Sequence, residues 1–181
     1  MRVIPLEIPG AARIAPEPAH DDRGSFARLF CAETFARHGL STAWAQMNRS
    51  RTRRRGVARG LHLQRAPRAE AKLVRCVSGA VFDAFVDLRE RSPTFGRALW
   101  VVLAAETGEA LHVPEGCAHG FQALTDDVEL HYCHSAPHAP DCEAGVSLSD
   151  PDLAVPWPLP LEGLSARDAA LPRLRDLAVG A

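Results

Sequence analysis

Two side chains stand out because each is the only one of its type in the chain and each suits proton or charge chemistry. Lys72 is the only lysine among 21 Lys and Arg residues, and Tyr132 is the only tyrosine beside seven phenylalanines. An ammonium group places one concentrated charge and three donors against a single oxygen atom, which a planar guanidinium does not do. A phenol offers a proton that phenylalanine lacks. Lys72 and Tyr132 are therefore candidate functional residues, although chance alone could also leave one of each.

Two segments resemble the two sequence motifs of the cupins. Gly56, His62 and Gly79 match the first motif. Gln64 stands in place of its second His, and Lys72 stands in place of its Glu. The resemblance implies a jelly roll in which His62, Lys72 and a His of the second motif point into the mouth of the barrel. An ammonium in place of the Glu repels a divalent cation, so no metal site is expected. The second motif is matched in full by Gly108, Pro114, Gly116 and His119.

The segments that must position these side chains read as short strands. Apolar or alternating runs are interrupted by Gly, Pro and Asp about every dozen residues, which predicts a β-sandwich or barrel. Helix signals occur only at 32–38, closed by Gly39, and at 165–177, where Ser165 and Asp168 have capping-box spacing. Prolines between 151 and 160 predict an irregular connection. The predicted strands are 25–30, 43–49, 57–63, 73–77, 80–88, 98–103, 110–113, 121–124 and 128–133.

Length and composition exclude several classes of protein. The 181 residues, 46% of them hydrophobic, predict a single domain over 1–181 with one core, so wholesale disorder is excluded. A formal net charge of -1 makes nucleic acid an unlikely partner. No apolar run is long enough to span a membrane, and residues 1–18 contain no secretory signal. Five cysteines without a CxxC pair predict free thiols and a cytoplasmic location.

One cluster of positive charge stands out although the net charge of the chain is close to zero. It lies between two predicted strands, where a solvated turn is the usual interpretation of a charge run. The alternative is a patch that steers a phosphorylated ligand toward the site. The cluster consists of Arg49, Arg51, Arg53, Arg54 and Arg55.

Nine short motifs follow one another along nearly the whole chain. They are PAHDDRG at 18–24, QMN at 46–48, RGLHLQ at 59–64, KLVR at 72–75, VFDAFVD at 81–87, SPTFG at 92–96, PEGCAHGF at 114–121, DPDL at 150–153 and SARDAA at 165–170. In this order they resemble the dTDP-4-dehydrorhamnose 3,5-epimerase family. Because so many motifs are in register, the resemblance is specific for the family and less so for the substrate.

The resemblance implies a metal-free isomerase that needs no cofactor and acts on a nucleotide-activated 4-keto-6-deoxyhexose. Hydrogens on C3 and C5 are both alpha to the carbonyl, so removal of either gives an enolate with its charge on the C4 oxygen. By the family pattern, His62 is the base, oriented by Asp168, and Lys72 stabilises the enolate oxygen. Tyr132 returns the proton from the opposite face. Asp168 could instead be only a helix cap, because capping-box spacing favours a carboxylate there.

The resemblance also implies which residues bind the substrate. Arg23 and Arg59 look like diphosphate ligands, because guanidinium groups match phosphate oxygens. Strict alternation places Arg59 and His62 on opposite faces of a strand, so a bulge at Gly60 is expected to restore a shared face. Gln46 and Asn48, two apart on one strand, would share a face and bind the sugar or nucleotide. His119 either orients the site or only fills the turn of its motif.

The segment 1–30 is expected, from the same resemblance, to cross to the partner subunit of a homodimer. Positions near the nucleotide depart from the family pattern, because Ala19, Pro137 and His138 replace aromatic residues and Arg28 replaces a Glu. A carboxylate accepts from N3–H of thymine or uracil, whereas Arg28 only donates and suits an acceptor edge such as that of cytosine. The sequence therefore predicts a nucleotide other than dTDP, such as CDP or GDP, or a loosely held base.

Three further questions stay open at this point. Members of the family invert C3, C5 or both with the same residues, so the inverted carbons are undetermined, as are the pathway and the final sugar. A sugar-nucleotide-binding cupin without turnover is a second hypothesis, which the complete set of base, acid and oxyanion donor argues against. A metal-dependent cupin isomerase or oxygenase is a third, which Lys72 in place of the Glu argues against.

Overall fold

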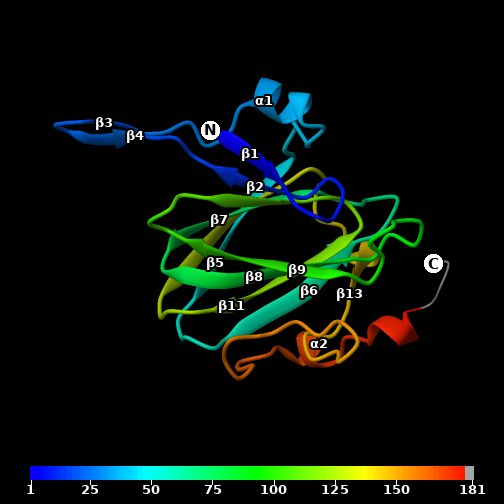
Figure 1. Cartoon of the computed structure of the whole chain (residues 1–181). Coiled ribbons are helices and arrows are strands. Elements are labelled where there is room, and N and C mark those ends of the chain that lie inside the picture. The colour runs from blue at the N-terminus through cyan, green and yellow to red at the C-terminus, as the bar shows by residue number, and fades with distance from the viewer. Residues whose placement is uncertain (178–181) are drawn as a thin grey trace.

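The computed structural model describes residues 1–177, and within this range eleven strands form two antiparallel sheets (Figure 1). The six-stranded sheet has the order β1-β2-β10-β7-β12-β5 and the five-stranded sheet the order β13-β6-β11-β8-β9. The first sheet contains β1 (Arg2–Pro5), β2 (Ala12–Ala15), β10 (Ala110–Val113), β7 (Lys72–Ser78), β12 (Val128–His134) and β5 (Gln46–Thr52). The second contains β13 (Glu143–Gly145), β6 (Ala58–Gln64), β11 (Cys117–Ala123), β8 (Ala80–Asp87) and β9 (Ala98–Ala104).

The remaining elements lie outside the sheets. A hairpin of β3 (Ala19–Asp21) and β4 (Gly24–Phe26) projects from the body near the N-terminus, where α1 (Ala32–Arg37) also lies (Figure 1). A single helical turn, α2 (Ala166–Ala169), lies on the opposite side of the sheets (Figure 1). Two 3-10 helices complete the elements, η1 (Pro140–Cys142) and η2 (Leu174–Asp176).

Alternating side chains build the core between the sheets. In β9, Leu103 is fully buried, whereas Trp100 and Val102 are 44% and 55% exposed. The period of two along a strand puts these side chains on opposite faces, so one face packs inward. The hydrophobic effect of this burial holds the two sheets together. The principal cluster contains Ile8, Val74, Val81, Phe85, Leu103, Leu111, Val113, Phe121, Val128 and Leu130.

The predicted all-β sandwich with short peripheral helices is confirmed, but several element boundaries are wrong. The predicted helix at 165–177 is only the turn α2, followed after an irregular stretch by η2. Pro172 lacks a backbone N–H and disfavours helical geometry at the residue before it, so the helix ends at Ala169. The capping box is present, because Ser165 Oγ accepts a hydrogen bond from the Asp168 backbone N–H at 3.0 Å.

Strand predictions fail where side chains are exposed or strands are short. The strand predicted at 43–49 is β5, which begins at Gln46 and continues to Thr52 through the Arg cluster. The bounds of β5 were misplaced because β5 is an edge strand of its sheet. Most of its side chains are exposed, so the sequence carries no apolar pattern there. The strand predicted at 25–30 ends at Phe26, and the strand predicted at 121–124 begins earlier, at Cys117. The sequence also missed β1, β2, β3 and β13, each of three or four residues.

The predicted bulge at Gly60 is confirmed. His62 lies opposite His119, and Arg59 lies opposite Phe121, so β6 holds one more residue than β11 across this step. The two backbones approach closely here, because a Cβ on Gly60 would lie 2.5 Å from Gly120 Cα. The bulge turns Arg59 and His62 toward the same cavity, which is described below.

Gly60→Ala is expected to destabilise the protein more than Gly39→Ala. Both glycines have positive φ, 121° and 67°, so both variants incur backbone strain of about 1 to 2 kcal/mol. Only at Gly60 does the new methyl group clash with backbone, whereas Gly39 has no neighbour within 4 Å. The clash should lower the free energy of unfolding by about a further 1 to 3 kcal/mol, measured by urea denaturation. Equal losses in the two variants would contradict the close approach of β6 and β11.

No helix within residues 1–177 has the length and apolar character needed to cross a membrane.

Candidate active site

A cavity of about 400 Å³ opens between the two sheets and is bordered by the segment that contains α2. Strands of both sheets contribute to its wall, which brings together residues that are more than 100 positions apart in the sequence. All four residues predicted to carry catalysis line it, as do three of the six predicted to bind substrate. The lining residues are Asn48, Arg49, Ser50, Arg59, His62, Lys72, His119, Gly120, Phe121, Tyr132, His134, Ser165, Arg167 and Asp168.

His62 on β6 forms a dyad with Asp168 on α2. The Nε2 atom of His62 lies 2.6 Å from Asp168 Oδ1, and Asp168 is only 5% exposed. A carboxylate accepts hydrogen bonds, so Nε2 donates and the lone pair is left on Nδ1. Burial lowers the pKa of His62, while the charge and hydrogen bond of Asp168 oppose this shift. The imidazole is thus held neutral at neutral pH, with one nitrogen free to accept a proton.

The helix turn α2 gives Asp168 two structural roles at once. Its backbone N–H is capped by Ser165, while its side chain leaves the helix to contact His62. The alternative that Asp168 is only a cap residue does not account for the short contact to the imidazole. A helix of one turn is enough to position Asp168 against His62, because only this one carboxylate must be fixed.

Lys72 at the start of β7 lies in the cavity wall with a side chain that is almost fully buried. Its Nζ donates to the backbone oxygen of His62 at 2.9 Å and lies 3.4 Å from Glu70 Oε1. Burial lowers the pKa of Lys72, and Glu70 is the largest opposing influence, ahead of Asp83 and Glu143. The arrangement places an ammonium group next to the base.

Tyr132 on β12 lies in the same cavity, flanked by two imidazole rings. Its ring stacks on His134 at a centroid distance of 6.1 Å and meets His119 edge-on at 6.0 Å. Burial raises the pKa of Tyr132 well above its usual value, so the phenol keeps its proton at neutral pH. A protonated phenol in this position can act as an acid.

His119 belongs to a second dyad, with Asp83 on β8. The His119 Nε2 atom lies 2.8 Å from Asp83 Oδ1, and both side chains are buried. The contact fixes the ring orientation of His119 in the cavity wall between His62 and Tyr132. His119 therefore belongs to the site itself rather than only to the turn of its motif.

Three polar side chains of β5 and β6 were predicted to bind the substrate, and two of them, Asn48 and Arg59, line the cavity. Arg59 contacts Thr52 Oγ1 and the backbone oxygen of Arg51, both at 3.4 Å. Gln46 and Asn48 share a face as predicted, because Gln46 Nε2 donates to Asn48 Oδ1 at 3.0 Å. Asn48 lines the cavity, whereas Gln46 does not and contacts the His138 backbone N–H instead.

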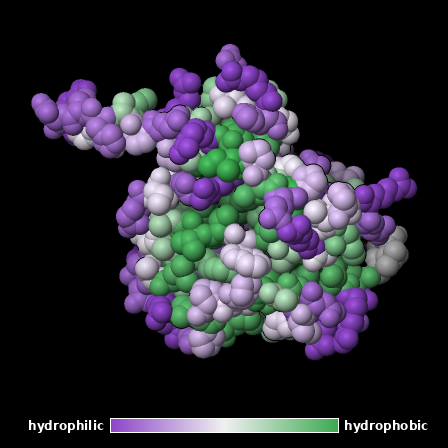
Figure 2. Space-filling view, in the orientation of Figure 1, coloured by the Kyte–Doolittle hydropathy of each residue, from purple (hydrophilic) through white to green (hydrophobic). Residues whose placement is uncertain are grey.

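Arg23 and Arg28 are not brought to the cavity of their own chain. Arg23 is the tip of the β3–β4 hairpin, with a side chain that is 90% exposed and an ion pair to Asp21 at 2.6 Å. Arg28 is exposed in the segment that follows β4. The hairpin stands clear of the body in the space-filling view (Figure 2). The cavity is therefore assembled without these two predicted ligands.

Three side chains around the site were not predicted from the sequence. Asp83 is one of two carboxylates in the otherwise apolar strand β8, and Glu70 and His134 each lie two positions from a predicted catalytic residue. Residues two apart on a strand share a face, so the spacing of His134 from Tyr132 on β12 was an available signal, whereas Glu70 precedes β7 and had none. Arg49 also lines the cavity, whereas Arg53, Arg54 and Arg55 are exposed in the turn after β5, as a solvated turn predicts.

The donor set does not suit a divalent metal ion. Among residues 1–177, no group of three or more His, Cys, Asp or Glu side chains is arranged to hold one. The three imidazoles of the cavity wall, His62, His119 and His134, are each engaged by a carboxylate. The ammonium of Lys72 lies in the same wall. A buried positive charge beside the imidazoles opposes cation binding.

Comparisons with known proteins show the family of this chain. The family model described as dTDP-4-dehydrorhamnose 3,5-epimerase matches residues 5–176. A dTDP-4-dehydrorhamnose 3,5-epimerase of Mycobacterium tuberculosis is 43% identical over 98% of this chain and 89% of the relative. A dTDP-4-dehydrorhamnose 3-epimerase of Streptomyces niveus is 42% identical over 93% of this chain and 81% of the relative.

Solved structures extend the likeness to three dimensions. The crystal structure of dTDP-4-dehydrorhamnose 3,5-epimerase from Elizabethkingia anophelis superposes with a TM-score of 0.94 at 34% identity, over 99% of both chains. The sequence match and the fold match cover the same strands that carry the cavity. The chain belongs to the dTDP-4-dehydrorhamnose 3,5-epimerase family, a family of isomerases that act on carbohydrates.

Proposed function

We propose that this protein epimerises a dTDP-linked 4-keto-6-deoxyhexose, at C3, C5 or both, by acid–base catalysis without a metal or other cofactor. The observation that carries this proposal is the presence in one cavity of a neutral imidazole, a protonated phenol and an ammonium. An inverting proton transfer next to a ketone needs these three functions and no others. The proposal takes the chain as one domain, which the family match across residues 5–176 supports.

The reaction begins with proton abstraction from a carbon alpha to the ketone. His62 Nδ1 takes the proton, the C–H electron pair forms the enolate double bond, and the carbonyl pair moves to the C4 oxygen. Lys72 donates a hydrogen bond to this oxygen, where the negative charge develops. Tyr132 then delivers its proton to the opposite face of the carbon, and the double bond collapses back to the ketone. Exchange with water returns His62 to its neutral form and Tyr132 to its protonated form.

The second His–Asp pair and the polar rim complete the proposed site. We assign His119, fixed by Asp83, to orient the sugar beside Tyr132. Arg59 and Asn48 lie at the cavity edge, where Arg59 suits the diphosphate and Asn48 the sugar or nucleotide. Gln46 supports Asn48 through its 3.0 Å hydrogen bond.

The nucleotide is assigned to dTDP on the names of the family and its relatives. The departure at Arg28 remains the reason to test this assignment, because a guanidinium cannot accept from the N3–H of thymine. The number of inverted centres is open for a related reason, since the relatives include both a 3,5-epimerase and a 3-epimerase.

We also propose a homodimer in which segment 1–30 of each subunit reaches the cavity of the other. Arg23, which does not line the cavity of its own chain, would then reach the diphosphate as predicted, and Arg28 the base. Exposed apolar side chains along this segment support a partner surface, because Phe26 is 80% exposed and Leu29 44%. A cytoplasmic location is part of the proposal and agrees with the five free cysteines.

A panel of nucleotide-linked 4-keto-6-deoxyglucoses tests the proposed function. NMR of the products should show inversion at C3, C5 or both with the dTDP sugar, at a kcat/KM above those for the CDP, UDP and GDP sugars. The spectra identify the nucleotide and the inverted carbon in the same experiment. Tight binding of the sugars without inversion of any of them would instead indicate a binding protein without turnover.

Asp168→Asn is expected to lower kcat by about 10- to 100-fold and to move the acid limb of the pH–rate profile to lower pH. The base must be neutral, so the rate is lost as pH falls through the pKa of His62. Asp168 raises that pKa by charge and by hydrogen bond, so its removal lowers the pKa and weakens the base. An unchanged kcat and an unchanged acid limb would show that Asp168 is only a helix cap.

A further inference from the structure

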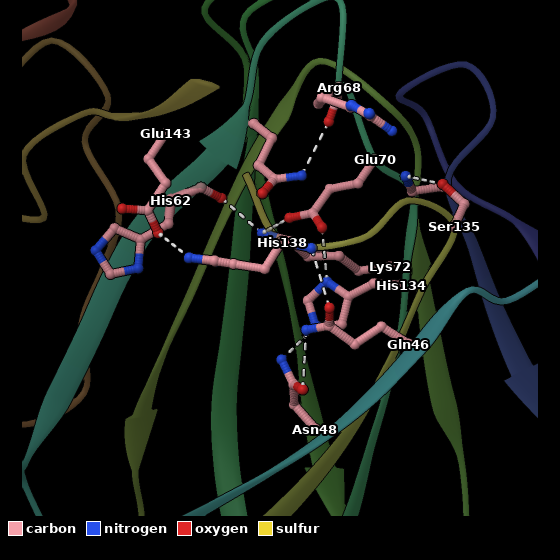
Figure 3. Close-up of polar contacts among 12 residues, drawn as sticks. Gln46, Asn48, His62, Arg68, Glu70, Lys72, His134, Ser135, His138 and Glu143 are labelled. Atoms are coloured by element: carbon pink, nitrogen blue, oxygen red, sulfur yellow. Dashed lines mark hydrogen bonds and ion pairs between the residues drawn. The ribbon is translucent and has the colours of Figure 1, made fainter. Parts of the chain in front are cut away.

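Glu70 is a buried carboxylate that the reaction proposed above does not use. It lies in the segment between β6 and β7 and is 8% exposed. One of its oxygens, Oε1, lies 3.4 Å from Lys72 Nζ, and the other, Oε2, lies 2.8 Å from His134 Nδ1. Figure 3 shows the Glu70 carboxylate among these side chains. A carboxylate buried to this degree needs such partners, because burial of an unpaired charge is costly.

A chain of hydrogen bonds leads to Glu70, and each member of the chain donates to the next. Gln46 Nε2 donates to Asn48 Oδ1 at 3.0 Å, and Asn48 Nδ2 lies 3.4 Å from His134 Nε2. A neutral imidazole that donates from Nδ1 to Glu70 accepts at Nε2, so the tautomer fits the Asn48 amide on the other side. Glu70 thus accepts from His134 on one side and pairs with Lys72 on the other (Figure 3). Its position is fixed from two directions.

The hydrogens of the Lys72 ammonium can be counted against these partners. An ammonium has three donors. One donates to the backbone oxygen of His62 at 2.9 Å, and a second faces Glu70 at 3.4 Å. The third is left for the cavity, where the C4 oxygen of the sugar must lie in the proposed reaction. Two fixed acceptors therefore leave one direction for the third donor.

We propose that Glu70 is a positioning residue that aims the Lys72 ammonium at the C4 oxygen of the substrate, and that His134 holds Glu70 in place. This inference rests on the proposed function and deepens it, because it explains how a single flexible side chain acquires one orientation. Without Glu70 the ammonium would lose both a fixed partner and the counter-charge nearest to it. The same carboxylate opposes the effect of burial on the pKa of the amine and so favours its protonated form.

Other charged groups also face Lys72, but they do not replace Glu70. Burial lowers the pKa of Lys72, and among the opposing influences Glu70 acts both by charge and by hydrogen bond, whereas Asp83 and Glu143 act by charge alone. The loss of Glu70 should therefore lower the pKa of Lys72. The titratable and charged groups around the cavity are Arg49 on β5, Arg59 and His62 on β6, Asp83 on β8, His119 on β11, Tyr132 and His134 on β12, Glu143 on β13, and Arg167 and Asp168 on α2.

The chain offers an unusually direct test, because Lys72 is its only lysine. Protein labelled with 13C at lysine Cε gives one lysine side-chain signal, whose pH titration reports the pKa of Lys72. Glu70→Gln keeps the shape and removes the charge, and should move this titration to lower pH by about one unit or more. The matched control is Glu129→Gln, since Glu129 also pairs with a histidine of β12, His131 at 3.0 Å, but does not line the cavity. The control should leave the lysine titration unchanged.

The pH–rate profile should change in the same direction as the lysine titration. Reaction requires the protonated amine, so the rate is lost as pH rises through the pKa of Lys72, and this basic limb should move to lower pH in Glu70→Gln. At pH 8 we expect kcat to fall about tenfold or more, with KM within about threefold, because the lost interaction acts on the enolate. Glu70→Asp keeps the charge on a shorter side chain and should restore part of both effects.

Two results would overturn the inference. One is a Glu70→Gln protein of normal thermal stability whose lysine titration and pH–rate profile match the wild type. The other is an equal loss of kcat in Glu70→Gln and Glu70→Asp without any shift of the lysine titration, which would mean that Glu70 only supports the fold. Wild-type protein that fails to epimerise every sugar of the panel would overturn the proposed function, while the lysine titration would still decide whether Glu70 governs Lys72.

Discussion

His62→Ala is expected to lower kcat for epimerisation by about 10²- to 10⁴-fold, the range usually lost with a general base. The substitution removes the imidazole whose Nε2 atom lies 2.6 Å from Asp168 Oδ1 in the cavity. Deuterium exchange at the alpha carbons should fall by the same factor, because proton abstraction precedes inversion. Both rates can be read from one NMR time course in deuterium oxide.

The control for this variant is His131→Ala. His131 also pairs with a carboxylate, Glu129, and lies on β12 outside the cavity wall. It should keep both rates within about twofold, since surface changes away from a site cost little. If His62→Ala kept full exchange at C3 and C5, another group would be the base and the proposed mechanism would be wrong.

Lys72→Ala is expected to lower kcat by about 10²- to 10³-fold, which corresponds to roughly 3 to 4 kcal/mol of lost oxyanion stabilisation. The charge on the C4 oxygen exists in the enolate and not in the ketone, so KM should change much less than kcat. The fold should survive, because Glu70 keeps its 2.8 Å contact with His134 when the ammonium is removed. Thermal unfolding provides this control.

Lys72→Arg separates charge from geometry at the same position. A guanidinium keeps the positive charge but spreads it over a plane and is larger than the ammonium. The variant should therefore recover only a small part of the lost kcat. Recovery of full activity would show that any positive charge suffices, and it would contradict the role of a single directed donor.

The candidate catalytic residues could be predicted from the sequence because they are residue types that occur once or lie in contiguous motifs. A lone lysine and a lone tyrosine are visible in composition, and the motifs around His62 and Asp168 are contiguous. Arg59 required a second step, since alternation alone places it on the wrong face and only a bulge at Gly60 brings it to the cavity. Gly60 was the signal for that bulge.

Glu70 and His134 were not predicted, because their roles depend on contacts between strands. Glu70 precedes β7 and His134 ends β12, and these two strands pair so that His134 lies opposite Lys72. Neighbouring strands meet through the register of the sheet, which no single segment encodes. The same limit applies to Asp83, whose partner His119 lies on another strand.

The fold was predicted best where side chains are buried on a regular period. Strand β8 is almost continuously apolar and was placed within one residue of its bounds, at 80–88 against Ala80–Asp87. Strand β5 was misplaced because it is an edge strand rich in exposed arginine. The predicted helix at 165–177 extended through Pro172, where the capping signal at Ser165 was correct and the length was not.

The most direct measurement of the central claim is deuterium incorporation by the wild-type enzyme. The account predicts that dTDP-4-keto-6-deoxyglucose, turned over in deuterium oxide with a strong chelator present, gains deuterium at every carbon that is inverted, because each new hydrogen comes from an acid in equilibrium with solvent. Inversion with the original hydrogen retained would contradict the account, as would an activity that the chelator abolishes and a divalent metal restores.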